Sequence, residues 1–174
     1  MNILRLIPSV SPSFGGPVEG IRQVSPILRR HGITTEVASF DTFSSQYVRD
    51  FVCKVNPLGS GVISYSYSHQ WIPWIRSNCY RFDVVIIHGI WQFTSFGGWL
   101  ALRKSKLPYF LYTHGMLDPW FNRTYPLKTA TKNRKSCPLS SSMAEQKQLR
   151  VFCFPARAYG GERDPESCCQ KETV

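Results

Sequence analysis

Asp83-Val84-Val85-Ile86-Ile87-His88-Gly89 is the stretch that decides the fold. Its four consecutive β-branched aliphatic residues predict a strand over Asp83–Ile87 that is buried on both faces, as in a parallel sheet covered by helices. A histidine and a glycine follow directly. We therefore expect a central strand with a chemically useful side chain, His88, at its carboxyl end.

Other strands are predicted on both sides of this stretch: Ile3–Ile7, Thr34–Phe40 and Leu107–Thr113. Helical patterns separate them, over Trp71–Tyr80 and Trp91–Lys104 and before Thr34. Residues 41–69 show no clear period and predict a variable loop. Repeated strand–helix–strand units favour an α/β fold, a Rossmann-like parallel sheet with flanking helices.

The first helical pattern follows a glycine-rich loop. Val18, Ile21, Val24 and Leu28 recur at helical spacing. Pro17 suits the first helical position, where a missing N–H costs nothing. Gly32 suits the helix stop, whereas a proline at position 26 is expected to kink or shorten the helix.

Bulk properties narrow the function classes. The 174 residues carry a net charge of +10, which favours anionic partners. The sequence contains no aromatic strand motif, GXXG loop or metal knuckle, so binding to nucleic acid is not expected. The six cysteines form no C-x-x-C pair, so no metal site is expected. No run approaches the length of about 20 consecutive apolar residues that a membrane-spanning helix needs, so such a helix is not expected. Arg5 and Pro8 interrupt the N-terminal apolar run, so a signal peptide is not indicated and a cytoplasmic protein is expected.

Three candidate site segments follow predicted strands. The first is the turn at Gly15 and Gly16, where backbone N–H groups at a helix start favour an anion such as a diphosphate. The others are the His-Gly pairs that begin at His88 and His114. Ligands of open α/β sheets bind outside the carboxyl ends of strands, so the three segments should share one rim. Taken alone, the glycines more often form a tight turn and a histidine at a strand end is more often structural; the three segments together favour a site.

The order of these segments resembles the N-terminal domain of GT-B glycosyltransferases of group 1 (family 4). The resemblance covers residues 2–128 and rests on Phe14-Gly15-Gly16-Pro17-Val18-Glu19-Gly20, on His88-Gly89-Ile90-Trp91-Gln92 after the strongest strand, and on Tyr112-Thr113-His114-Gly115-Met116-Leu117-Asp118-Pro119-Trp120. It implies a retaining transfer of sugar from a nucleotide-sugar donor to a glycan or lipid-linked hydroxyl acceptor. It implies neither a metal nor another cofactor.

The resemblance also implies residue roles. Gly15 and Gly16 would approach the donor diphosphate, and His114 would contact the transferred sugar as the catalytic residue. The acceptor cleft would be lined by His88, Trp91, Asp118 and Trp120. Charge and position alone suggest that Arg22 and Arg123 meet phosphates. The basic charge is compatible with peripheral membrane association.

The pattern stops after Lys128. Residues 129–174 contain no tryptophan and are rich in serine, lysine, cysteine and proline. Only Val151–Phe154 there is strand-like, and it is isolated. We expect domains at 1–128 and 129–174, the latter an aberrant or disordered tail whose deletion leaves stability unchanged. The family's second domain, with its Glu-x7-Glu motif, is not found, so a frameshifted or truncated fragment without activity of its own is expected.

Two alternatives stay open. One is a non-catalytic α/β fragment that binds weakly or not at all. The other is an α/β-hydrolase, which needs a nucleophilic serine on a G-x-S-x-G elbow. The nearest candidate, Ser60, lacks the first glycine and does not follow a predicted strand.

Overall fold

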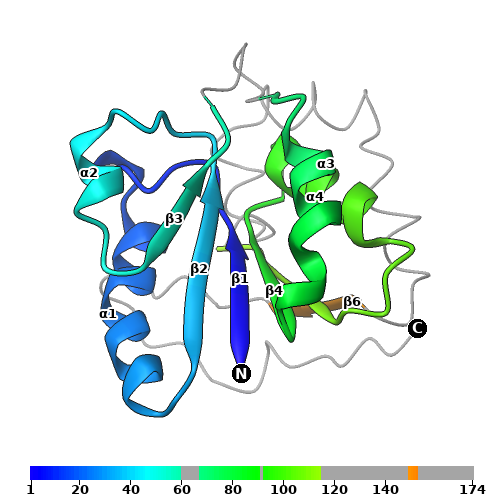
Figure 1. Cartoon of the computed structure of the whole chain (residues 1–174), viewed down its shortest axis with the longest axis horizontal. Helices are drawn as coiled ribbons and strands as arrows, with labels where there is room; N and C mark the ends of the chain where they lie inside the picture. Colours follow the sequence, from blue (N-terminus) through cyan, green and yellow to red (C-terminus); the bar gives the residue numbers. More distant parts are fainter. Residues whose placement is uncertain (60–66, 91, 115–148, 153–174) are drawn as a thin grey trace, which may run out of the picture.

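A computed structural model describes residues 1–59, 67–90, 92–114 and 149–152 of the chain. Its centre is a six-stranded sheet in which every neighbouring pair is parallel, in the order β3-β2-β1-β4-β5-β6 (Figure 1). The strands are β1 (Asn2–Leu6), β2 (Thr34–Ser39), β3 (Lys54–Pro57), β4 (Val84–His88), β5 (Tyr109–Tyr112) and β6 (Leu149–Phe152). The expected α/β fold with a parallel Rossmann-like sheet is confirmed.

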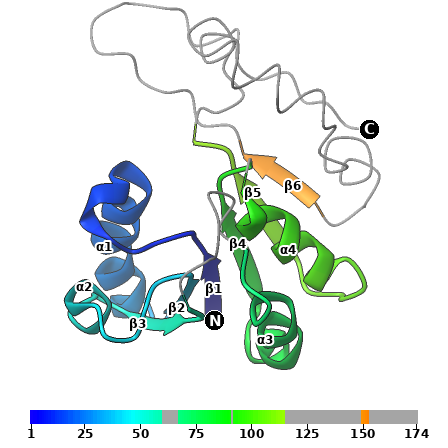
Figure 2. The same cartoon turned by 90° about the horizontal axis from the view of Figure 1, so that it is seen from above.

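Helices cover both faces of the sheet. They are α1 (Gly16–Arg30), α2 (Gln46–Arg49), α3 (Trp71–Asn78) and α4 (Phe93–Leu102), with single 3-10 turns at Pro12–Phe14 and Cys79–Arg81. In the view from above, α1 and α2 lie on one side of the sheet, and α3 and α4 lie on the other (Figure 2). The two sides are called the α1 face and the α4 face below.

The α4 face holds the larger core. Leu4, Leu6, Val85 and Ile87 point toward it and pack against α3 and α4, where Trp71 is fully buried. Alternate residues of the same strands therefore point to the α1 face, since successive side chains of a strand point to opposite faces.

Helix α4 packs unusually close to its neighbours. A Cβ added at Gly97 would lie 2.7 Å from Cδ1 of Trp71, and one at Gly98 would lie 2.9 Å from Cδ1 of Leu6. Both distances are too short for a methyl group. The paired glycines therefore allow α4 to approach α3 and β1.

Helix α1 runs through its internal proline. The expectation that Pro26 shortens the helix is wrong, because the helix continues to Arg30. Ser25 Oγ donates to the Ile21 carbonyl at 2.7 Å, so a side-chain bond supports the turn before the proline. Leu28, beyond the proline, still packs against Ile3 and its neighbours on the sheet.

Two segments differ from the sequence expectations. Residues 41–69 hold helix α2 and edge strand β3 in addition to loop. The strand-like stretch near residue 151 is not isolated, because Leu149–Phe152 pairs in parallel with β5. These four residues fall within the segment expected to be disordered, so the sheet includes part of it; the rest of 129–174 lies outside the described residues.

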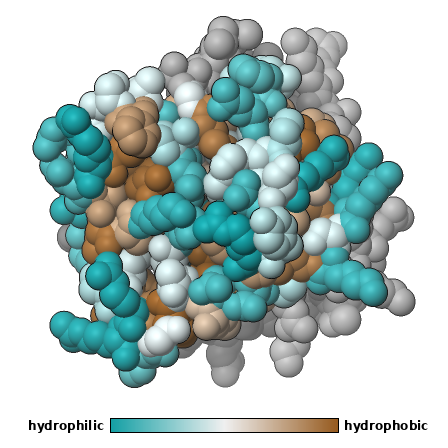
Figure 3. All heavy atoms as spheres, viewed as in Figure 1, coloured by the Kyte–Doolittle hydropathy of each residue, from teal (hydrophilic) through white to brown (hydrophobic). Residues whose placement is uncertain are grey.

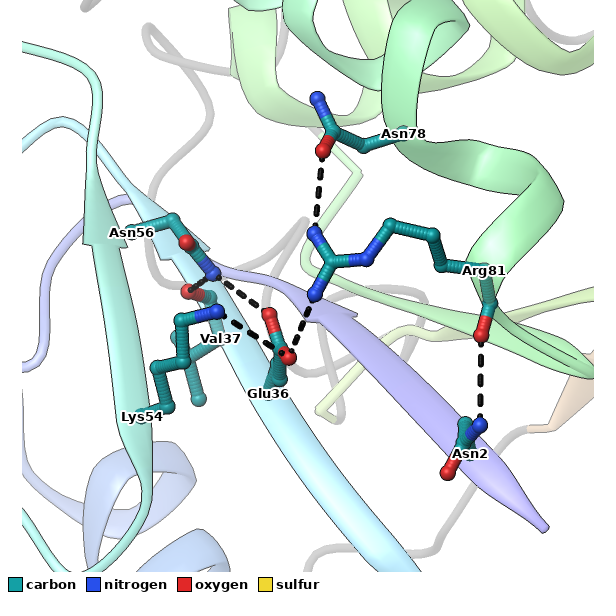
Figure 4. Close-up of polar contacts among 7 residues, drawn as sticks. All are labelled: Asn2, Glu36, Val37, Lys54, Asn56, Asn78 and Arg81. Atoms are coloured by element: carbon teal, nitrogen blue, oxygen red, sulfur yellow. Dashed lines mark hydrogen bonds and ion pairs between the residues drawn. The ribbon is translucent and has the colours of Figure 1, made fainter.

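The α4 face turns polar beyond its helices, over β2 and β3. Glu36 there accepts from Arg81 at 2.8 Å, from Lys54 at 3.3 Å and from Asn56 at 3.1 Å (Figure 4). Figure 3 shows hydrophilic side chains across the middle of this side of the molecule. The Glu36 cluster thus joins β2, β3 and the turn before β4 where no described helix covers the sheet.

No helix in the described ranges is both long and apolar enough to cross a membrane.

Candidate functional site

The carboxyl edge of the sheet gathers the predicted site segments. Strand β1 leads into the turn before α1, β4 ends at His88, and β5 leads to His114. Because β1, β4 and β5 are parallel neighbours, these ends lie along one edge of the sheet. His88 shares the α1 face with Val84 and Ile86, and α1 begins at this edge. One rim therefore carries both a helix start and the histidines.

The two histidines contact each other directly. His88 Nδ1 and His114 Nε2 are 2.8 Å apart, and the rings are nearly parallel, with centroids 5.0 Å apart. The Tyr112 ring also stacks on His88, with centroids 5.7 Å apart. His88 is buried, whereas His114 is exposed. The pair thus connects the interior of the sheet to its surface.

Backbone geometry at the two histidine ends is constrained. His114 has φ 51°, in the left-handed region that non-glycine residues seldom adopt. Gly89, after His88, has φ 83°, and its N–H donates to the Tyr112 carbonyl at 2.8 Å. Unfavourable backbone of this kind persists where the surroundings hold it, and it concentrates at functional sites.

Arg5 completes the cluster from the middle of β1. Its guanidinium Nη1 lies 3.4 Å from Nε2 of His88, and its side chain is buried. Its Nε has no hydrogen-bond partner, and among the described residues no carboxylate forms an ion pair with it. A buried cation without an acid partner is costly, so the fold retains it against a penalty.

Both histidines are held neutral at pH 7. Burial, the Arg5 charge and His114 together lower the pKa of His88 well below its ordinary value of 6.5. Partial burial of the His114 ring, which removes water from it, also lowers the pKa of His114. Neutral imidazoles can hydrogen-bond to a substrate without adding a positive charge.

The glycine turn presents few unpaired N–H groups to an anion. Gly15 caps α1 with φ 73°, a backbone conformation that glycine adopts readily. Its carbonyl accepts hydrogen bonds from the N–H groups of Val18 and Glu19. Pro17 is the second helical residue, not the first as expected, and has no N–H. Gly16 is thus the residue of this turn whose N–H has no partner among the described residues, and a Cβ there would meet nothing within 4 Å.

Asp41 fixes the loop that leads to this turn. The buried carboxylate accepts from Ser9 Oγ at 2.6 Å, from Val10 N–H at 2.8 Å and from Tyr47 O–H at 3.2 Å. The loop between β1 and α1 is therefore tied to the segment after β2. This contact determines where the glycine turn lies on the rim.

The predicted site residues divide into three groups. His88 and His114 are in contact, and Gly15 and Gly16 lie at the same edge of the sheet. Arg22 lies on the exposed side of α1, within reach of Glu19 at 4.0 Å. The remaining residues lie outside the described part of the chain: Trp91, Asp118, Trp120 and Arg123.

Sequence reasoning missed Arg5 and Asp41. For Arg5 a signal existed, because a charged residue inside the apolar run Ile3–Ile7 is unusual in a buried strand. For Asp41 none did, since an aspartate after a strand is common at turns.

Comparisons with known proteins bear on the fold. No protein-family model and no curated protein sequence matches the chain. Among solved structures, a glycosyltransferase from Rickettsia africae matches 86% of the chain at 16% identity with a TM-score of 0.50. This likeness shows that the chain shares the fold of the matched part of that glycosyltransferase.

Two other solved structures are similar to this chain, with lower TM-scores. A protein described as a UDP-N-acetylglucosamine 2-epimerase from Listeria monocytogenes aligns with 72% of it at 15% identity and a TM-score of 0.47. MurG from Acinetobacter baumannii also aligns with 72%, at 14% identity and a TM-score of 0.46. The chain spans 33%, 38% and 42% of the epimerase, MurG and Rickettsia structures, respectively.

Proposed function

We propose that this chain supplies one side of the active site of a glycosyltransferase that moves a sugar from a nucleoside diphosphate to a hydroxyl acceptor with retention. The observation that carries the proposal is the contact between His88 and His114 at the ligand-binding edge of a GT-B-type sheet. The glycine turn at the start of α1 supports it, because a helix start favours the diphosphate.

The chemistry that the site supports is electrostatic and positional. Neutral His114 can hydrogen-bond to a hydroxyl or phosphate oxygen, and the Gly16 N–H can meet a second oxygen. Stabilising charge that develops on the leaving diphosphate is the kind of assistance such donors give. Asp118 and Trp120 remain proposals for the acceptor side.

The proposed reaction needs more protein groups around the donor than this chain supplies. Transfer requires the donor to be enclosed, water to be excluded and the acceptor to be aligned. We propose that the 174-residue chain alone binds donor weakly and does not turn it over. A glycan or lipid-linked acceptor is proposed, with a peripheral contact to an anionic membrane supported by the net charge of +10.

Donor binding can be tested on the full chain. NMR titration with UDP- and GDP-sugars should shift the resonances of Gly16, His88 and His114. His114→Ala should abolish those shifts, whereas His31→Ala, at the exposed end of α1, should preserve them. The absence of any shift in the folded chain would contradict the proposal and favour a non-catalytic fragment.

Turnover is a separate measurement. Incubation of the chain with the same donors and acceptors should release no transferred sugar. Sustained transfer that His114→Ala abolishes would overturn the claim that the chain is inactive alone, while supporting the proposed site.

A further inference from the structure

Two successive hydrogen bonds link Arg5 to His88 and His88 to His114, and their donor and acceptor atoms can be assigned. An arginine side chain has only donors, and neutral histidine has one donor and one acceptor nitrogen. Arg5 Nη1 faces Nε2 of His88, so that nitrogen must accept and carry no hydrogen. In neutral His88 the hydrogen is then on Nδ1.

The same reasoning extends to His114. His88 Nδ1–H lies 2.8 Å from His114 Nε2, which must therefore accept. In neutral His114 the hydrogen is then on Nδ1, which has no partner among the described residues. The chain of bonds thus runs from a buried cation to an N–H group on an exposed side chain.

We propose that Arg5 is a positioning residue that acts through His88 to fix His114 as an N–H donor toward an oxygen of the bound ligand. His114 Nε2 is occupied by His88, so His114 does not serve as a general base through that nitrogen. The proposal rests on the proposed function for the identity of the ligand, and it assigns the ligand group as an acceptor, a phosphate or hydroxyl oxygen.

Packing supports a directing role for Arg5 over a structural one. Its strand neighbours in register are Val37 and Ile86, both buried and apolar. An aliphatic residue would fit this position without the cost of burying a charge. His88 is the described residue with which the guanidinium forms a polar contact. The guanidinium also lies within electrostatic range of Tyr112 and Cys53, but its hydrogen bond is to His88.

The groups that face His88 come from three segments. Arg5 approaches from β1, Tyr112 stacks on it from β5, and His114 follows β5. Arg5 and His114 both oppose protonation of His88, and burial does so most strongly. Removing the guanidinium should therefore free the tautomer of His88 and ease its protonation.

The test is 15N NMR of the histidine rings in the full chain, which distinguishes protonated from lone-pair nitrogens. At neutral pH, wild-type His88 and His114 should both carry hydrogen on Nδ1. Arg5→Met should give a mixture of His88 tautomers and shift its protonation midpoint to higher pH. Arg5→Lys, which keeps a charged donor, should restore the wild-type pattern, and Arg30→Met, an exposed change on α1, should have no effect.

Several results would overturn the proposal. Hydrogen on Nε2 of either wild-type ring, or a charged His88 at neutral pH, would do so without any variant, even if Arg5→Met does not fold. An unchanged His88 pattern in folded Arg5→Met would do so too. Fixed tautomers without any donor binding would instead leave this proposal standing and contradict the proposed glycosyltransferase site.

Discussion

Single side chains determine the geometry of the rim. Arg5, His88 and His114 form a line from the centre of the sheet to its carboxyl edge, while Asp41 holds the loop before the glycine turn. Each of these residues is costly to bury unless its polar atoms are matched. Two predictions at the residue scale follow from those matches.

Asp41→Asn should destabilise the protein by about 1–3 kcal/mol, because an amide N–H₂ replaces an oxygen that accepts from a buried donor. Asp50→Asn is the matched control: this exposed carboxylate accepts from Gln46 on the same helical turn and should change stability by less than about 0.5 kcal/mol. Urea denaturation measures both. Equal effects of the two variants would show that Asp41 does not hold the loop.

Stability should fall as the pH drops below about 6.5, the ordinary histidine value. Because the folded state lowers the pKa of both His88 and His114, the unfolded chain takes up protons first as the pH falls. For the buried His88, unfolding gains up to about 1.4 kcal/mol per pH unit. His88→Gln should flatten this dependence. A dependence that persists in full without His88 would contradict its assignment.

At the scale of elements, close packing of α4 is the feature that a side chain can disturb. Gly97→Ala should cost about 1–3 kcal/mol, since its Cβ would lie 2.7 Å from the fully buried Trp71 ring. Higher helix propensity of alanine offsets at most about 1 kcal/mol of this.

Gly20→Ala is the matched control for that change. Gly20 is also helical, and nothing lies within 4 Å of its added Cβ, so alanine should stabilise α1 by about 0.4–1 kcal/mol. Thermal or urea unfolding of the two variants should thus give opposite signs. A stabilising Gly97→Ala would show that α3 and α4 can move apart without cost.

For the whole molecule, the question is how much residues 129–174 contribute to the fold. Deleting them removes β6 and leaves β5 as the edge strand, paired in parallel with β4 alone. We expect the midpoint of thermal unfolding to fall in the shortened chain, because the backbone hydrogen bonds between β5 and β6 are lost. Identical midpoints would restore the expectation, drawn from composition, that this segment adds nothing to the domain.

Periodicity and strand chemistry predicted most of the sheet. The run Val84–Ile87 is apolar on both sides, which is possible only where helices cover both faces, and the order of patterns predicted a parallel sheet. The edge strand β3 was missed because it is short, half-covered and ends at Pro57. Its pairing with β2, not an alternating pattern, makes it a strand.

For the candidate site too, some features could be predicted from the sequence and others could not. Sequence alone indicated that His88 lies at the carboxyl end of one strand and His114 beyond the end of another, since both come directly after strand-like runs, and that a glycine turn begins the first helix. Only the tertiary structure decided that the two rings touch, that Arg5 reaches His88 and that Asp41 holds the loop. These contacts join residues 26, 83 and 31 positions apart. Strand order and register bring such distant residues together, and no local pattern in the chain encodes either.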